Sequence, residues 1–126
     1  MPTTARVVVV PEDSGPLTVE QVDLPDPGPF QVVVKQYASG ICHSQLHEMH
    51  RERQTPVILG HEATGVVLKV GAEVTHVQEG DTVLVTWVPR DVESAARSAE
   101  GVTLDLPDGR QAVTGSVFTW ADHTLV

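Results

Sequence analysis

The chain has 126 residues and a formal net charge of −9 at pH 7, from 17 acidic and 8 basic side chains. This acidic balance argues against nucleic acid and membrane surfaces as partners, because both attract basic proteins. The length suits a single domain over residues 1–126, and no apolar run approaches the roughly 18 to 20 residues that span a membrane. Cys42 is the only cysteine and no signal peptide is evident, so we expect a reduced, cytoplasmic setting.

Short apolar segments between turn residues predict a mainly β fold. Three prolines make the connection at 25–29 a loop, because proline cannot sit in a central strand. The Asp-Gly pair at 108–109 is typical of a hairpin turn, and residues 90–101 read as a loop or a short helix. Strands at about 8 to 12 residue spacing favour a small barrel or sandwich. In chain order, the expected strands cover 6–10, 17–24, 30–39, 65–71, 82–88, 102–106, 111–113 and a last one from Val117 toward Val126.

The best helix candidate runs from Cys42 to about Arg53, a stretch without glycine or proline. On such a helix His43 and His47 are four residues apart, and His50 follows three residues later, so these imidazoles can share one face. Cys42 would lie at the helix N-terminus, where the helix dipole stabilises a thiolate.

Two stretches concentrate the chemically active side chains. They read Gly-Ile-Cys-His-Ser-Gln-Leu-His at 40–47 and Gly-His-Glu-Ala-Thr-Gly at 60–65. Together they carry one thiol, three imidazoles and one carboxylate. These are the ligand types that bind a borderline-soft metal such as zinc.

Structural readings of the same residues stay open. A single cysteine such as Cys42 is often a small buried hydrophobe. His61 and Glu62 could form an exposed loop pair, although the flanking glycines argue against that. His43 and His47 could be a solvated helix face.

The two stretches are followed by Val-Gly-Ala-Glu-Val at 70–74 and Gly-Asp-Thr-Val at 80–83. In this order the motifs resemble the catalytic domain of the zinc-dependent medium-chain alcohol dehydrogenases, and the resemblance covers nearly the whole chain. It implies a GroES-like, partly open β-barrel with one short helix. It also implies hydride transfer between a small alcohol or aldehyde and NAD(P) in an intact enzyme.

The resemblance implies a zinc site. Cys42 and His61 match zinc ligands of the family, and Glu62 matches a carboxylate that lies close to the metal and can enter its shell. The zinc ion would lower the pKa of an alcohol oxygen, which must lose its proton before hydride can leave the carbon.

The resemblance also implies a proton path and a cofactor contact. Ser44 matches the hydroxyl that takes the alcohol proton, and His47 matches the outer end of the relay, reached through the cofactor ribose. His43 matches a residue that touches the cofactor pyrophosphate. The nicotinamide accepts the hydride, and the protein positions it.

The sequence departs from the family in several ways. It contains no G-x-G-x-x-G turn of a Rossmann domain, so we expect no activity from this chain alone. The family's further thiolate ligand is also absent, so we expect weak or absent zinc binding. The segment 88–114 has no cysteines, so we expect no structural zinc. Gln45 replaces the usual aspartate behind the zinc-bound histidine, and such changes can cost roughly tenfold to a hundredfold in affinity.

Two functional hypotheses follow. The first is the zinc-binding catalytic domain of an alcohol-dehydrogenase-like oxidoreductase. The alternative is a non-catalytic, stand-alone GroES-like module, or a subunit completed by a separate chain. Because an open barrel leaves strand edges unpaired, the alternative includes self-association through those edges.

Overall fold

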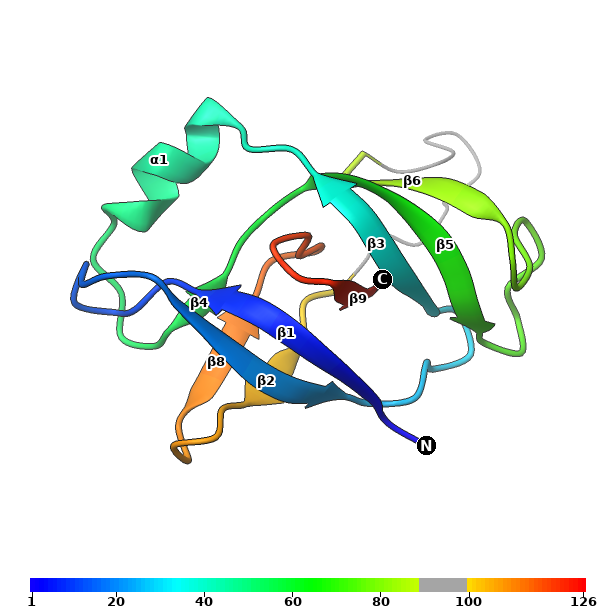
Figure 1. The fold of residues 1–126 in the computed structure, drawn as a ribbon, viewed down its shortest axis with the longest axis horizontal. Coiled ribbons are helices and arrows are strands. Elements are labelled where there is room, and N and C mark those ends of the chain that lie inside the picture. The colour runs from blue at the N-terminus through cyan, green and yellow to red at the C-terminus, as the bar shows by residue number, and fades with distance from the viewer. Residues whose placement is uncertain (89–99) are drawn as a thin grey trace.

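A computed structural model describes residues 1–88 and 100–126, and strands dominate it (Figure 1). Its one described helix is short and is drawn apart from the sheets in Figure 1. No described helix is long and apolar enough to cross a membrane. The elements in order are β1 (Thr3–Val9), β2 (Thr18–Leu24), β3 (Val32–Ser39), α1 (His43–Met49), β4 (Val57–Ile58), β5 (Glu62–Val70), β6 (Thr82–Thr86), β7 (Thr103–Asp105), β8 (Gln111–Thr114) and β9 (His123–Leu125).

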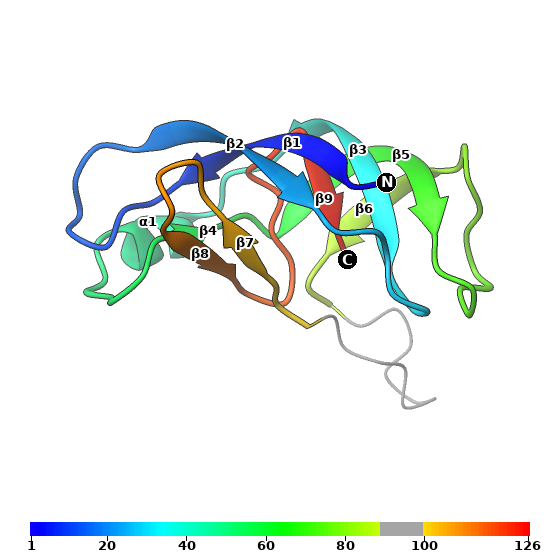
Figure 2. The ribbon, with the colours of Figure 1, turned by 90° about the horizontal axis from the view of Figure 1, so that it is seen from below.

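The strands form three sheets that wrap into a partly open barrel (Figure 2). β1 and β2 are an antiparallel pair, and β6-β5-β3-β9 is an antiparallel sheet of four strands. In the third sheet, β4-β8-β7, the short β4 runs parallel to β8. Isolated bridges from Val7 to Ala121 and from Val10 to Val57 connect β1 to the other two sheets. The mainly β fold expected from the sequence is therefore confirmed, and no closed barrel forms among the described residues.

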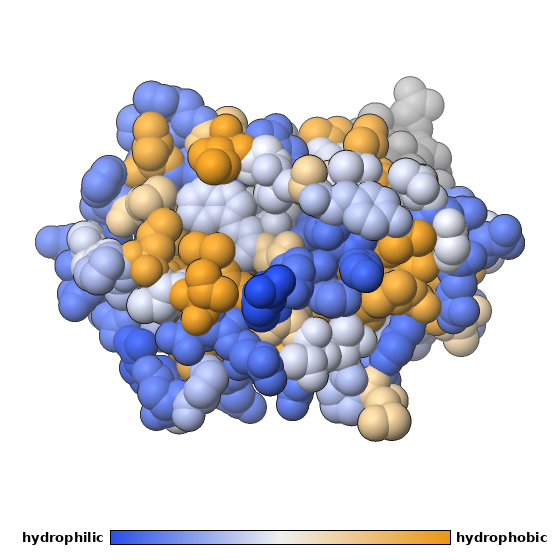
Figure 3. Space-filling model, in the orientation of Figure 1, coloured by the Kyte–Doolittle hydropathy of each residue, from blue (hydrophilic) through white to orange (hydrophobic). Residues whose placement is uncertain are grey.

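The interior contains two apolar clusters, built largely from valine and leucine. The larger one lies between β1, β2, β7 and β8 and includes Phe118, while the smaller one lies on the four-stranded sheet around Val34 and Val67. Some large apolar side chains remain outside, as the mixed surface in Figure 3 illustrates. Leu84 on the edge strand β6 is 83% exposed and Trp87 is 60% exposed.

The helix and the last strand are shorter than the sequence predicted. The helix ends at Met49 rather than near Arg53, because the chain must leave it to reach β4, which pairs with β8 and bonds to Val10. Only His123–Leu125 of the last segment pairs as a strand. In residues 117–122, backbone carbonyl oxygens bond to a side chain instead of to a neighbouring strand. The side-chain amide of Gln36 donates to the carbonyl oxygens of Thr119 and Ala121 at 3.1 and 2.7 Å.

Two further differences concern strand ends. The sequence missed β4, and β5 begins at Glu62, three residues before the expected start. The hairpin of β7 and β8 is confirmed, with Gly109 at a φ of +90° in its turn. The expected loop or helix at 90–101 lies largely outside the described residues.

Candidate functional site

Cys42 lies directly before α1, at the N-cap position, in an extended conformation. Its backbone N–H donates to Oε1 of Gln45 at 2.9 Å, which is the half of a capping box that the third helical residue supplies. Gln45 is only 3% exposed and is the one buried residue of the helix. The Gln45 side chain therefore anchors α1 and fixes the backbone that carries the thiol.

The Cys42 thiol is partly exposed, and its polar neighbours stabilise the thiolate. The Ser44 hydroxyl and backbone N–H, with a smaller contribution from the N–H of His43, hold the pKa of Cys42 below its ordinary value. The nearby Glu62 carboxylate acts in the opposite direction. The Ser44 hydroxyl thus lies beside the thiol, and the Glu62 carboxylate is near enough to act on it electrostatically.

The two motif stretches, 40–47 and 60–65, contact each other at Gly40. Gly40 donates its N–H to the carbonyl oxygen of Glu62 at 2.8 Å. A Cβ on Gly40 would lie 2.2 Å from Oε1 and 2.6 Å from Cγ of Glu62, so the Glu62 side chain occupies the space above this glycine. A residue with a side chain at position 40 would displace the carboxylate from the thiol.

Thr119 supports the start of β5 from the far end of the chain. It is fully buried, and its hydroxyl lies 2.9 Å from Ser39 Oγ and 3.4 Å from the carbonyl oxygen of Glu62. Its N–H donates to the carbonyl oxygens of Leu59 and Gly60 at 3.1 and 3.2 Å. Sequence reasoning missed Thr119, and no motif marks it, because it acts through backbone contacts.

His43 and His47 project from the exposed side of α1. Their ring centroids are 5.2 Å apart with an interplanar angle of 75°, which confirms that they share a helix face. His50 is the C-cap residue of the helix and makes no such ring contact in the described part of the chain.

The donor set matches zinc in type: a stabilised thiolate, an imidazole and a carboxylate. Glu62 lies close enough to Cys42 to influence its pKa, and His61 is half-buried beside Glu62. Within residues 1–88 and 100–126, however, no three His, Cys, Asp or Glu side chains converge well enough to hold a metal ion. The buried Nε2 of Gln45 also has no hydrogen-bond partner.

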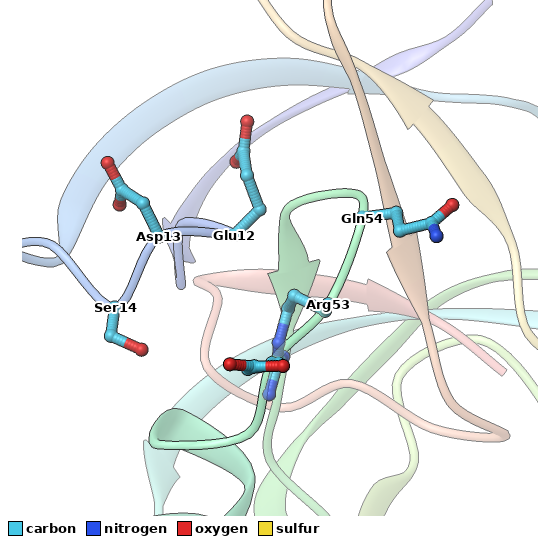
Figure 4. A pocket seen from close by; sticks show the side chains of 6 residues that line it. Glu12, Asp13, Ser14, Arg53 and Gln54 are labelled. Atoms are coloured by element: carbon cyan, nitrogen blue, oxygen red, sulfur yellow. The ribbon is translucent and has the colours of Figure 1, made fainter.

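One polar pocket, of about 590 Å³, lies apart from these residues (Figure 4). One wall comes from the loop after β1 and the other from the segment after α1. It contains none of the predicted site residues, and its Glu12 carboxylate is already paired with the Arg110 guanidinium at 3.0 Å. The lining residues are Glu12, Asp13, Ser14, Glu52, Arg53 and Gln54.

Comparisons with known proteins agree with the motifs. The chain is 45% identical over 89 residues to an alcohol dehydrogenase of Rhizobium meliloti (strain 1021), covering 68% of this chain and 26% of that protein. It is 37% identical over 103 residues to a sorbitol dehydrogenase of Gallus gallus, covering 76% of this chain and 29% of that protein. The chain therefore spans between a quarter and a third of the length of these two relatives.

Solved structures share the fold. An "alcohol dehydrogenase zinc-binding domain protein" from Burkholderia ambifaria matches with a TM-score of 0.82 at 20% identity, covering all of this chain and 40% of that one. CAD from Helicobacter pylori, complexed with NADP(H), matches with a TM-score of 0.70 at 19% identity, with the same coverage. The family model described as "Alcohol dehydrogenase GroES-like domain" matches residues 28–124. The chain thus belongs to the alcohol dehydrogenase family, in which it corresponds to the GroES-like domain.

Proposed function

We propose that this chain is the zinc-binding catalytic domain of an alcohol-dehydrogenase-like oxidoreductase. In the intact enzyme it would take part in hydride transfer between a small alcohol or aldehyde and NAD(P), in the cytoplasm. The observation that carries this proposal is geometric: the N–H of Gly40 donates to the carbonyl oxygen of Glu62 at 2.8 Å, which places the stretch with Cys42 beside the stretch with Glu62. Zinc binding would use the Cys42 thiolate and the Glu62 carboxylate, and proton transfer would use the Ser44 hydroxyl.

Cys42, His61 and Glu62 would hold the zinc ion. Zinc, when bound, supplies a positive charge that favours loss of the alcohol proton. Gln45 keeps the backbone of Cys42 in place through the hydrogen bond at 2.9 Å, although it adds no negative charge behind His61. Because the three donors do not yet form a convergent group, we expect binding to require a movement of His61.

Ser44 would accept the proton of the alcohol, since its hydroxyl already lies against the Cys42 thiol. His47, one helical turn further on and exposed, would pass the proton toward solvent. His43 would contact the cofactor pyrophosphate from the same helix face. Each role uses the position of the side chain on α1, which Gln45 anchors.

The alternative is a non-catalytic GroES-like module, or a subunit that a separate chain completes. Two observations favour it. No three ligands converge among the described residues, and the edge strand β6 pairs only with β5 within them. The exposed Leu84 on that edge offers apolar surface for self-association.

Zinc content per chain, measured by mass spectrometry on untagged protein, separates the two functions. In protein equilibrated with excess zinc, the catalytic reading predicts one weakly held ion that the wild type binds and that Cys42→Ala and His61→Ala each lose. His50→Ala is the matched control, because it removes an exposed imidazole outside the proposed ligand set, and it should retain the ion. A folded wild type without zinc, or a Cys42→Ala variant that binds as much zinc as the wild type, would contradict the catalytic reading and favour the module.

A further inference from the structure

Helix α1 presents two imidazoles to solvent that the zinc hypothesis does not use as ligands. His43 and His47 are exposed, four residues apart, and their ring centroids lie 5.2 Å apart. Gln45 is the only buried residue of this helix, whereas both histidines are exposed, so their rings have room to turn.

This separation suits a shared metal ion. Zinc binds imidazole nitrogen at about 2.0 to 2.1 Å. Two imidazoles that meet one ion at angles between a right angle and a tetrahedral angle therefore have centroids about 4.5 to 5.3 Å apart. The observed edge-to-face arrangement does not aim both nitrogens at one point. Rotating one ring about its terminal torsion corrects this at low cost, because that torsion is broad and the side chain is exposed.

We propose that His43 and His47 form a second metal site, a two-histidine chelate on the surface of α1 for a divalent transition metal ion. Imidazole suits nickel, copper and zinc. Water completes the coordination, since no third His, Cys, Asp or Glu joins these side chains among the described residues. The net charge of −9 favours cations near the chain.

The nearest cationic residue along the chain is Arg51, just after the helix. It is paired with Glu48 at 3.1 Å, so its charge is offset. The site differs from the proposed zinc site in its donors, because it uses no thiolate and no residue of β5. It can therefore exist whether or not Cys42 and His61 hold zinc.

Nickel is the probe, because Ni²⁺ binds imidazole and does not oxidise the Cys42 thiol. Untagged protein, stripped with a chelator, is titrated with NiCl₂ in a calorimeter. We expect His43→Ala and His47→Ala each to weaken this binding at least tenfold, because the second imidazole binds intramolecularly. His50→Ala removes the same kind of group outside the pair and should change affinity less than twofold.

The Cys42→Ser variant separates this inference from the proposed function. It should keep the nickel equivalent that His43→Ala and His47→Ala lose, even if it loses zinc. Nickel binding that is lost in Cys42→Ser, or that falls as much in His50→Ala as in His47→Ala, would overturn the proposal. So would unchanged affinity in His47→Ala. Far-ultraviolet circular dichroism checks that each variant is folded.

Discussion

Gly60 immediately precedes His61, and its substitution tests how the chain holds this histidine. Its φ is +103°, in the range that disfavours any residue with a Cβ. A Cβ there would lie 2.3 Å from Thr119 Oγ1, 2.7 Å from Thr119 N and 2.6 Å from Trp120 N. Such contacts are far inside van der Waals distance, so either Gly60 or the segment at 119–120 must move.

That segment cannot move without breaking hydrogen bonds. The N–H groups of Thr119 and Trp120 both donate to the carbonyl oxygen of Leu59, at 3.1 and 3.0 Å. Positive φ costs a residue with a side chain about 1–3 kcal/mol, and overpacking adds about 1–3 kcal/mol. We therefore expect Gly60→Ala to lower the free energy of unfolding by about 2–6 kcal/mol, against a typical total of about 5–15 kcal/mol.

Gly80→Ala is the matched control. Gly80 has a φ of +91°, but a Cβ there would meet nothing within 4 Å, so only the backbone term applies. The difference between the two variants isolates the contact with Thr119. With a urea m-value of about 1–3 kcal/mol per molar, Gly60→Ala should unfold at roughly 1 M less urea than Gly80→Ala. Equal midpoints would show that the loop at 119–120 yields freely and does not hold His61.

Two further predictions concern charge. Burial raises the pKa of the Asp122 carboxyl, but the hydrogen bonds that it accepts from His123 and Arg6 outweigh burial and lower that pKa overall. The ionised carboxylate therefore stabilises the folded state above about pH 4, and this contribution is lost as the pH falls through the folded pKa. Asp122→Asn should therefore lower the urea midpoint at pH 7 by the equivalent of about 0.5–1 kcal/mol, and the gap to wild type should narrow as the pH falls below about 4; a gap independent of pH would refute this. Ser44→Ala should raise the pKa of Cys42 and shift the pH profile of its alkylation upward, whereas Ser44→Thr, which keeps the hydroxyl, should not.

Much of the fold follows from local patterns in the sequence. The valine run of β1 and the Asp-Gly turn between β7 and β8 are recognisable because their signals lie within a few residues. The failures have a different cause. β4 has only two residues and exists because it pairs with β8 and with Val10, both distant in sequence. Similarly, residues 117–122 look like a strand locally, but Gln36 binds two of their carbonyl oxygens.

The candidate site was likewise predictable only where the signal is local in sequence. The motifs pointed to Cys42, Ser44 and Glu62, which lie near one another in the structure. The roles that the resemblance assigned to them, and to His43, His47 and His61, stay predictions. Gln45 stood out in the sequence because it lacks the negative charge of the aspartate that the family usually has behind the zinc-bound histidine. Its hydrogen bond to the N–H of Cys42 could not be read from its type alone, because it depends on where the helix begins.

The residues that hold the site act mainly through their backbone or through missing atoms. Gly40 leaves room for the Glu62 side chain, Gly60 leaves room for Thr119, and Thr119 bonds to the backbone on both sides of His61. The two glycines have no side chain, and the buried Thr119 hydroxyl is directed at Ser39 and the backbone of Glu62. Their effect is to fix where β5 starts relative to α1, and hence how far His61 must move to join Cys42. A search of the sequence for reactive groups passes over such residues, although the arrangement of the proposed ligands depends on them.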